Sequence, residues 1–169
     1  MAEPRKSVTR YVPSQSEKAA ALSDVAYEIE QIFALLSTWP RQMGLQQNAW
    51  LEAALIHTRQ LLDFFEDSNR SVSKGRENDD VLALDFGFTA QPVVFNTLYR
   101  ERLNKDLAHL SYSRQQRTGA AKSWNLTLLQ PLLERCREFA DHVVAAWPSS
   151  LAADQVQRWK KLGNAHKAP

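Results

Sequence analysis

The sequence predicts an all-α protein, namely an antiparallel four-helix bundle with a long loop between the second and third helices and a short C-terminal helix. Apolar residues recur at helical spacing in four long stretches, and no stretch shows the sustained polar–apolar alternation of a half-buried strand. The chain has 169 residues with five Trp and seven Phe, enough for a sizeable core without disulfides or metal. We therefore expect a single helical domain.

The first helix is predicted from Glu17 to Ser37. Ser14 or Ser16 can cap its N-terminus, because a serine hydroxyl accepts a hydrogen bond from a free backbone N–H of the first turn. Trp39-Pro40 ends the helix, since proline cannot continue it. Residues 1–15 are polar and proline-containing, so we expect them to form a flexible N-terminal segment.

The second helix is predicted from Asn48 to Glu66, with leucines and a phenylalanine on one face. Residues 67–74 are polar and typical of a loop. Asp79 or Asp80 can then cap a short helical turn over 81–86. These residues together form the long loop that precedes the third helix.

The third helix is predicted to open at Thr89 and Pro92, since proline fits a first turn, where its missing N–H is not needed. The fourth lies within 124–147. Its pattern includes Pro131, so we expect the helix either to begin near Leu128 or to kink just before the proline.

The bundle is expected to cover residues 16–148, followed by a C-terminal amphipathic helix and basic tail over 149–169. In this tail, Trp159 could stack on a nucleic-acid base. Three other tryptophans are expected to anchor the core or a dimer interface: Trp50, Trp124 and Trp147.

The single cysteine, Cys136, cannot form an internal disulfide and lies at helical spacing among apolar residues, so we expect it to be buried. The N-terminal residues contain neither the apolar region of a signal peptide nor a stretch long enough to cross a bilayer. The sequence thus predicts a soluble cytoplasmic protein without membrane contact, and it indicates no cofactor.

The net charge of +2 is too small to indicate nucleic-acid binding by itself, but the charges are unevenly distributed. Residues 98–122 carry six Lys or Arg against two acidic residues, whereas residues 63–85 carry seven acidic residues against three basic ones. We therefore expect a basic and an acidic region. The sequence leaves open whether the basic region is an anion-binding surface or a set of solvated helix faces.

The third helix carries Arg102, Asp106 and His109 on one polar stripe. Asp106 lies about 40° and His109 about 20° around the axis from Arg102, while the neighbouring leucines cluster roughly 80–140° away. A histidine beside a fixed positive charge suits acid–base chemistry on a phosphate, as in metal-free RNA cleavage. One helix offers one histidine, so a symmetric dimer would complete the acid–base pair. The simpler interpretation is a surface ion pair of Arg102 with Asp106 beside a boundary histidine.

The segment Arg102–Leu110, with Arg-x6-His, and the following Ser111-Tyr-Ser-Arg114 resemble the HEPN superfamily of helical-bundle proteins, in particular uncharacterised bacterial members of the abortive-infection type. The similarity also includes Leu55–Phe64 and Asp79–Asp85, and it spans about Ala19 to Trp147. HEPN proteins are identified by an arginine followed four to six residues later by a histidine, after two long helices and an extended loop.

This resemblance implies a dimeric bundle that acts as a metal-independent endoribonuclease in toxin–antitoxin or anti-phage defence. Arg102 would contact the phosphate and His109 would act as the acid/base, supported by Asn104, Lys105 and Asp106. The surrounding cations would bind RNA: Arg100, Arg114, Arg117 and Lys122. The expected partners are a second copy of the chain, RNA and a cognate antitoxin protein. The alternative is a non-catalytic helical module of the same fold, used for dimerisation or protein interaction.

A divalent-metal site would define a different enzyme class. It would draw on His57 and His109 together with three aspartates: Asp79, Asp80 and Asp85. No helix carries the His-x3-His or Glu-x-x-His pair that usually seats a metal in a bundle, so we predict no metal. His57 lies on a stripe of large apolar residues and is interpreted as a half-buried packing histidine, and Arg59 with Asp63 as a structural pair.

Overall fold

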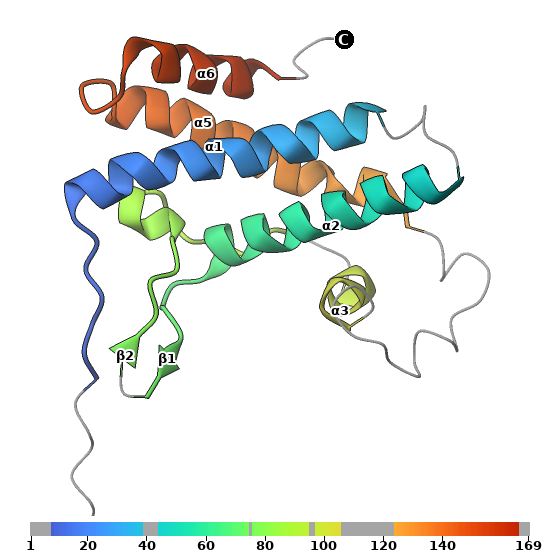
Figure 1. Cartoon of the computed structure of the whole chain (residues 1–169), viewed down its shortest axis with the longest axis horizontal. Helices are drawn as coiled ribbons and strands as arrows, with labels where there is room; N and C mark the ends of the chain where they lie inside the picture. Colours follow the sequence, from blue (N-terminus) through green and yellow to red (C-terminus); the bar gives the residue numbers. More distant parts are fainter. Residues whose placement is uncertain (1–7, 39–43, 75, 95–96, 106–123, 166–169) are drawn as a thin grey trace, which may run out of the picture.

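The computed structural model describes residues 8–38, 44–74, 76–94, 97–105 and 124–165, which are mostly helical, as predicted. The first part of the chain forms α1 (Gln15–Thr38), α2 (Gly44–Glu66), β1 (Val72–Ser73), β2 (Arg76–Glu77) and the 3₁₀ helix η2 (Ala83–Phe86). The second part forms α3 (Thr97–Lys105), the 3₁₀ helix η4 (Leu126–Leu129), α5 (Gln130–Ala146) and α6 (Ala153–Asn164) (Figure 1).

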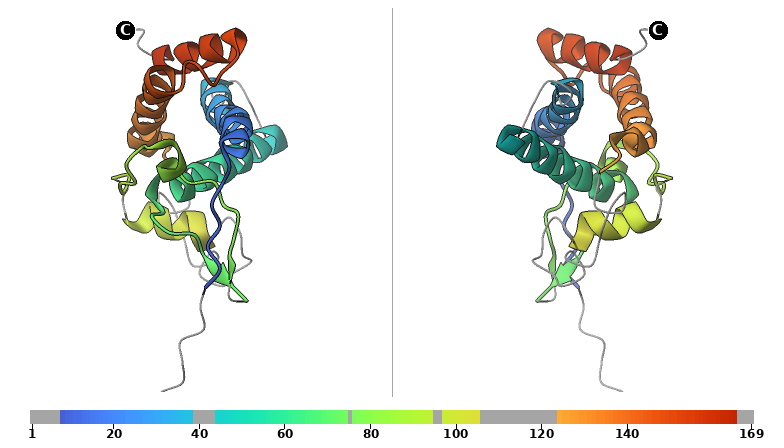
Figure 2. Two further views of the ribbon diagram at one scale, coloured as in Figure 1. Left: turned by 90° about the vertical axis from the view of Figure 1, so that its left-hand side faces the viewer. Right: turned by 90° about the vertical axis from the view of Figure 1, so that its right-hand side faces the viewer.

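Four main helices, α1, α2, α5 and α6, contact one another in a ring, in which α2 packs on α1 and α5 while α6 packs on α5 and α1. The described part of α3 is seen end-on in Figure 1 and from the side in Figure 2, so it crosses below α2. The ring therefore differs from the predicted bundle. The C-terminal helix, which we placed after the bundle, is one of the four helices in contact.

Phe139 on α5 lies at the centre of the core and is completely buried. Its ring contacts five other aromatic rings, with centroid separations between 5.1 and 5.8 Å. These rings come from α2, η2, the residue after Gly87, and α6: Phe64, Phe65, Phe86, Phe88 and Trp159. Most of these contacts are edge-to-face, the geometry that aromatic pairs prefer. The aromatic cluster thus joins α2, α5 and α6.

The N-terminus of α1 is closed by a capping box, as the sequence allowed for Ser14. The backbone N–H of Glu17 donates to the Ser14 hydroxyl over 3.2 Å, and the backbone N–H of Ser14 donates to the Glu17 carboxylate over 2.7 Å. The Ser14 hydroxyl also donates to the Glu17 carboxylate over 2.6 Å, and this bond, with the one from the Ser14 backbone, holds the pKa of Glu17 below its usual range. The predicted bounds of this helix are confirmed to within two residues.

The α2 helix begins four residues earlier than predicted, at Gly44, whose positive φ of 61° suits a residue without a side chain. The helical turn predicted over 81–86 is a 3₁₀ helix that starts at Ala83. Its N-cap residue is Leu82, whose backbone N–H donates to the Asp85 carboxylate over 2.9 Å, and not Asp79 or Asp80 as we expected.

The predicted start of the third helix, at Thr89 and Pro92, is wrong: α3 begins at Thr97, and residues 89–94 are not helical. This segment is held by tertiary contacts with the end of α2. Gln91 N–H donates to the Phe65 carbonyl over 3.2 Å, and Val93 N–H donates to the Glu66 carboxylate over 2.6 Å. These contacts override the local preference of proline for a first helical turn.

Of the two outcomes predicted for Pro131, the structure shows a helix that begins near Leu128 and not a kink. A 3₁₀ helix capped by Asn125 precedes α5, and Pro131 lies in the first turn of α5, where no backbone N–H is needed. Cys136 is completely buried, as predicted, and burial raises the pKa of its thiol. Within the described ranges, no helix is long and apolar enough to cross a membrane.

Phe139→Ala is expected to lower the free energy of unfolding by about 3–5 kcal/mol, because it removes the ring on which the aromatic cluster converges and leaves a cavity. Urea unfolding followed by circular dichroism measures this. Val94→Ala is the control: the side chain of Val94 is 84 % exposed, so its loss should change stability by no more than about 0.5 kcal/mol. A loss below about 1 kcal/mol for Phe139→Ala would show that the core does not depend on this ring.

Candidate functional site

The structure describes only the first part of the predicted arginine–histidine stripe. Arg100 and Arg102 lie on the described part of α3, while the side chains of Asn104 and Lys105 are outside it. Five further predicted residues fall in 106–123 and lie outside the described residues: Asp106, His109, Arg114, Arg117 and Lys122. The pairing of Arg102 with His109 therefore stays a prediction.

Arg102 is buried, although we expected it to face a solvent-reachable cleft. Its side chain is only 5 % exposed, and its guanidinium carbon lies 4.0 Å from the centroid of the Trp124 ring. Tyr99, one turn earlier on α3, meets the same ring edge-to-face at 5.0 Å. Burial raises the pKa of Tyr99 to about 12, and the nearby charge of Arg102 partly offsets this. Arg102 thus joins α3 to the residues just before η4.

Arg100, predicted to bind RNA, is occupied by contacts within the chain. Its guanidinium donates to both carboxylate oxygens of Glu66 and, over 3.1 Å, to the carbonyl of Val93. The bond to Glu66 also raises the pKa of Arg100. Because Glu66 accepts the N–H of Val93 as well, one carboxylate at the end of α2 fixes both the extended segment and α3.

His57 is half-buried, as predicted, but its partner was missed. Its Nδ1 lies 2.6 Å from the Glu28 carboxylate on α1, and its ring meets that of Tyr27 edge-to-face. In the alternative metal site, Asp85 is already bound to Arg70. Among the described residues, no group of three or more His, Cys, Asp or Glu side chains is placed to hold a metal ion.

The structure tests the roles predicted for two tryptophans, one of which was wrong. Trp159, considered for base stacking, is 1 % exposed and packs against Phe139 in the core, so it is not available to a nucleic acid. Trp147 is half-buried, and its indole N–H donates to the Phe86 carbonyl over 3.3 Å, in agreement with an anchoring role.

A cavity that the sequence did not reveal lies between α1, α2 and residues 80–82. We call it the acidic hollow; its volume is about 390 Å³. Its lining includes five carboxylates, from α1, from α2 and the residue that follows it, and from the loop before η2: Asp24, Glu28, Asp63, Asp67 and Asp80. The rest of the lining is the polar Gln60 and six apolar residues: Ala21, Val25, Leu61, Phe64, Val81 and Leu82. The combination is an apolar floor with a negatively charged rim.

The electrostatics of the acidic hollow are most visible at Asp63. Desolvation raises the pKa of its carboxyl group, and the negative charges of Asp67, Glu66 and Asp80 raise it further, against a lowering effect of Arg59. The high density of acidic residues over 63–85 predicted an acidic region. The contribution of α1 was missed because only the packing of α1 on α2 brings Asp24 and Glu28 to it.

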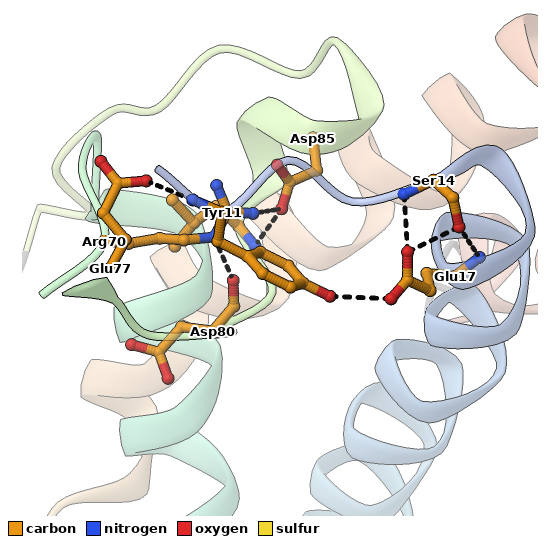
Figure 3. A network of polar contacts seen from close by, with 8 residues as sticks. Tyr11, Ser14, Glu17, Arg70, Glu77, Asp80 and Asp85 are labelled. Atoms are coloured by element: carbon orange, nitrogen blue, oxygen red, sulfur yellow. Dashed lines mark hydrogen bonds and ion pairs between the residues drawn. The ribbon is translucent and has the colours of Figure 1, made fainter. Parts of the chain in front are cut away.

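One wall of the acidic hollow is fixed by a polar network (Figure 3). Arg70 donates to the Asp85 carboxylate over 2.6 Å and to the Asp80 carbonyl over 3.0 Å, and its guanidinium lies over the ring of Tyr11. The backbone N–H of Tyr11 donates to the Glu77 carboxylate over 3.0 Å. Residues 8–14, which lie in the segment predicted to be flexible, are thereby attached to β2 and to the loop before η2.

The chain matches no protein-family model, no curated protein and no solved structure. The similarity to the HEPN superfamily therefore rests on the sequence motifs alone.

Asp63→Asn is expected to stabilise the protein at pH 7, by at most about 1 kcal/mol because the site is solvent-exposed. A raised native pKa means that the folded state binds the proton more tightly than the unfolded state. Stability is therefore lost as pH rises from the ordinary value of 3.8 through the raised value. The gain should vanish below about pH 3.8, where Asp63 is protonated in both states. Thermal unfolding between pH 3 and 7 measures it.

Glu52→Gln is the matched control, since Glu52 is exposed on the same helix and does not line the acidic hollow. It should show no such dependence on pH. A stabilisation of equal size in both variants would mean that the effect comes from net charge and not from the local repulsion at Asp63.

Proposed function

We propose that this chain is a HEPN-like helical protein that serves as a non-catalytic dimerisation or protein-interaction module. The observation that carries this proposal is the burial of Arg102 against Trp124. The sequence motifs that resemble HEPN proteins, together with the helical fold, support the family.

Catalysis on RNA would require the guanidinium of Arg102 to reach a phosphate. A phosphate-binding arginine must present its N–H donors to the reacting group as negative charge develops. Arg102 is 5 % exposed, and its guanidinium is stacked on an aromatic ring, a contact worth about 2 kcal/mol when desolvated. Reaching an RNA phosphate would require the side chain to leave this contact. Arg100 would likewise have to give up Glu66.

The second candidate is a metal-independent endoribonuclease, which the Arg-x6-His motif itself favours. In this version His109 is the acid/base, Arg102 turns toward the phosphate when two copies pair, and Asn104, Lys105 and Asp106 support them. Arg114, Arg117 and Lys122 would then contribute positive charge to an RNA-binding groove.

The role of Arg102 can be tested by its effect on stability. Arg102→Ala is expected to lower the free energy of unfolding by about 2 kcal/mol, because the variant loses a buried cation–π contact. Lys160→Ala, at an exposed position of α6, is the control and should stay within about 0.5 kcal/mol. If Arg102→Ala unfolds like the wild type, the arginine is not structural, and the catalytic version gains support.

The two versions are separated by RNA cleavage in the presence of EDTA. We expect no cleavage above background by the wild type or by His109→Ala, with size-exclusion chromatography confirming that both are folded. His57→Gln is the matched control, because it changes a histidine that lies outside the motif. Cleavage by the wild type and by His57→Gln, but not by His109→Ala, would overturn the proposal in favour of the endoribonuclease.

A further inference from the structure

We propose that the acidic hollow is the docking groove for a basic segment of a partner polypeptide, which inserts an arginine or lysine side chain next to an apolar one. The groove is separate from α3, and its lining does not include Arg102 or Trp124.

The apolar floor can cover the hydrocarbon part of such a segment. Leu61 and Phe64 on α2 and Val25 on α1 are at least nine-tenths buried, yet they line an open space of about 390 Å³. This volume is at the lower end of ligand pockets, which measure about 300–1,000 Å³. Long cationic side chains bury their methylene groups on such surfaces while their charged ends stay at a polar rim.

The negative charge of the rim is only partly compensated: Arg59 lowers the pKa of Asp63, but desolvation and the neighbouring carboxylates outweigh it. In the part of the chain that the structure describes, no lysine or arginine forms an ion pair with Asp24, Asp63 or Asp67. Asp24 and Asp63 lie on two helices that pack on each other, and Asp67 directly follows the second of them, so the fold keeps the three carboxylates on one side of the molecule. An incoming cation would be favoured by charge complementarity, which also selects against acidic partners.

The spacing of the carboxylates favours an extended cationic group over a metal ion. Calcium and magnesium need six or more oxygen ligands around one point, several of them from the protein in a calcium site. Within the described ranges, the acidic side chains do not converge in a group that could hold such an ion. A guanidinium instead carries five N–H donors in a planar fork and can reach carboxylates at several places along a rim.

The groove is formed before any partner binds. Its loop wall, which includes Asp80 and Leu82, is held by Arg70 and by the Asp85 cap. Its other walls are two long helices. A preformed groove saves the ordering cost that would otherwise reduce affinity.

This inference rests on the proposed interaction role, for which it names a partner. The peptide experiment can nevertheless fail while the tests of that role succeed, and the reverse. If the peptide experiment below fails, the RNA cleavage result and the stability effect of Arg102→Ala still stand. If the wild type cleaves RNA, the charge and shape of the groove are unchanged. We then still expect it to bind the peptide.

The test uses fluorescence anisotropy with a short labelled peptide of alternating arginine and leucine at about 0.15 M salt. The same peptide with citrulline in place of arginine has nearly the same shape without the charge. We expect the citrulline peptide to bind at least about tenfold more weakly. The double variant Asp63→Asn/Asp67→Asn should lose at least about tenfold in affinity for the arginine peptide, whereas Glu52→Gln should bind it like the wild type. Thermal unfolding checks that the variants are folded.

Three results would overturn the proposal. Equal binding of the arginine peptide by the wild type and the double variant would place the binding elsewhere. Equal binding of the two peptides would exclude a role for charge. Displacement of the peptide by Mg²⁺ or spermidine, beyond the effect of NaCl at the same ionic strength, would identify a site for small cations and not a groove for a polypeptide.

Discussion

The structure depends on the packing of Phe139 against the rings that meet it from α2, the η2 region and α6. Such a buried cluster is worth several kcal/mol and tolerates little displacement, because interiors are packed as densely as organic crystals. It fixes the C-terminal end of α2. Glu66, at that end, then binds both Val93 and Arg100, so the position of α3 follows from the aromatic core through one carboxylate.

This chain of contacts changes how the charges of the protein are interpreted. By composition the third helix begins a basic region, but the two arginines that the structure describes there are used internally, one on Glu66 and one on Trp124. The carboxylates of the acidic hollow are instead gathered around open space, and Asp24, Asp63 and Asp67 have no such cationic partner among the described residues. In the described part of the molecule, a group of carboxylates without cationic partners therefore lies between α1, α2 and residues 80–82.

Helices with strong local signals could be predicted from the sequence. The apolar period and a serine cap at Ser14 or Ser16 predicted α1, and the start near Leu128 that Pro131 suggested lies close to the observed start of α5 at Gln130. Features set by tertiary contacts could not be predicted. The strands β1 and β2 have two residues each, too few for any alternation, and residues 89–94 are held extended by the end of α2 against the preference of Pro92. Trp159 has an amphipathic environment in sequence, and only the contact of α6 with α5 shows that it belongs to the core.

The same limit applies to the candidate site. Helical geometry placed Leu103 on the apolar face, and Leu103 is buried, but the projection of a single helix could not show that Arg102 is buried as well, against Trp124. The acidic density of 63–85 was visible in the sequence. Its pairing with Asp24 and Glu28 was not, because residues about 40 positions apart become neighbours only when α1 packs on α2.

The proposed role of this protein depends on Arg102 being a buried structural residue. Modification of the folded protein with phenylglyoxal, followed by peptide mass spectrometry, measures the accessibility of each arginine directly. The account predicts that Arg102 stays unmodified while the exposed Arg10 and Arg76 react, and that Arg102 reacts once the protein is unfolded in urea. Modification of Arg102 in the folded protein at the rate of Arg10 and Arg76 would contradict it.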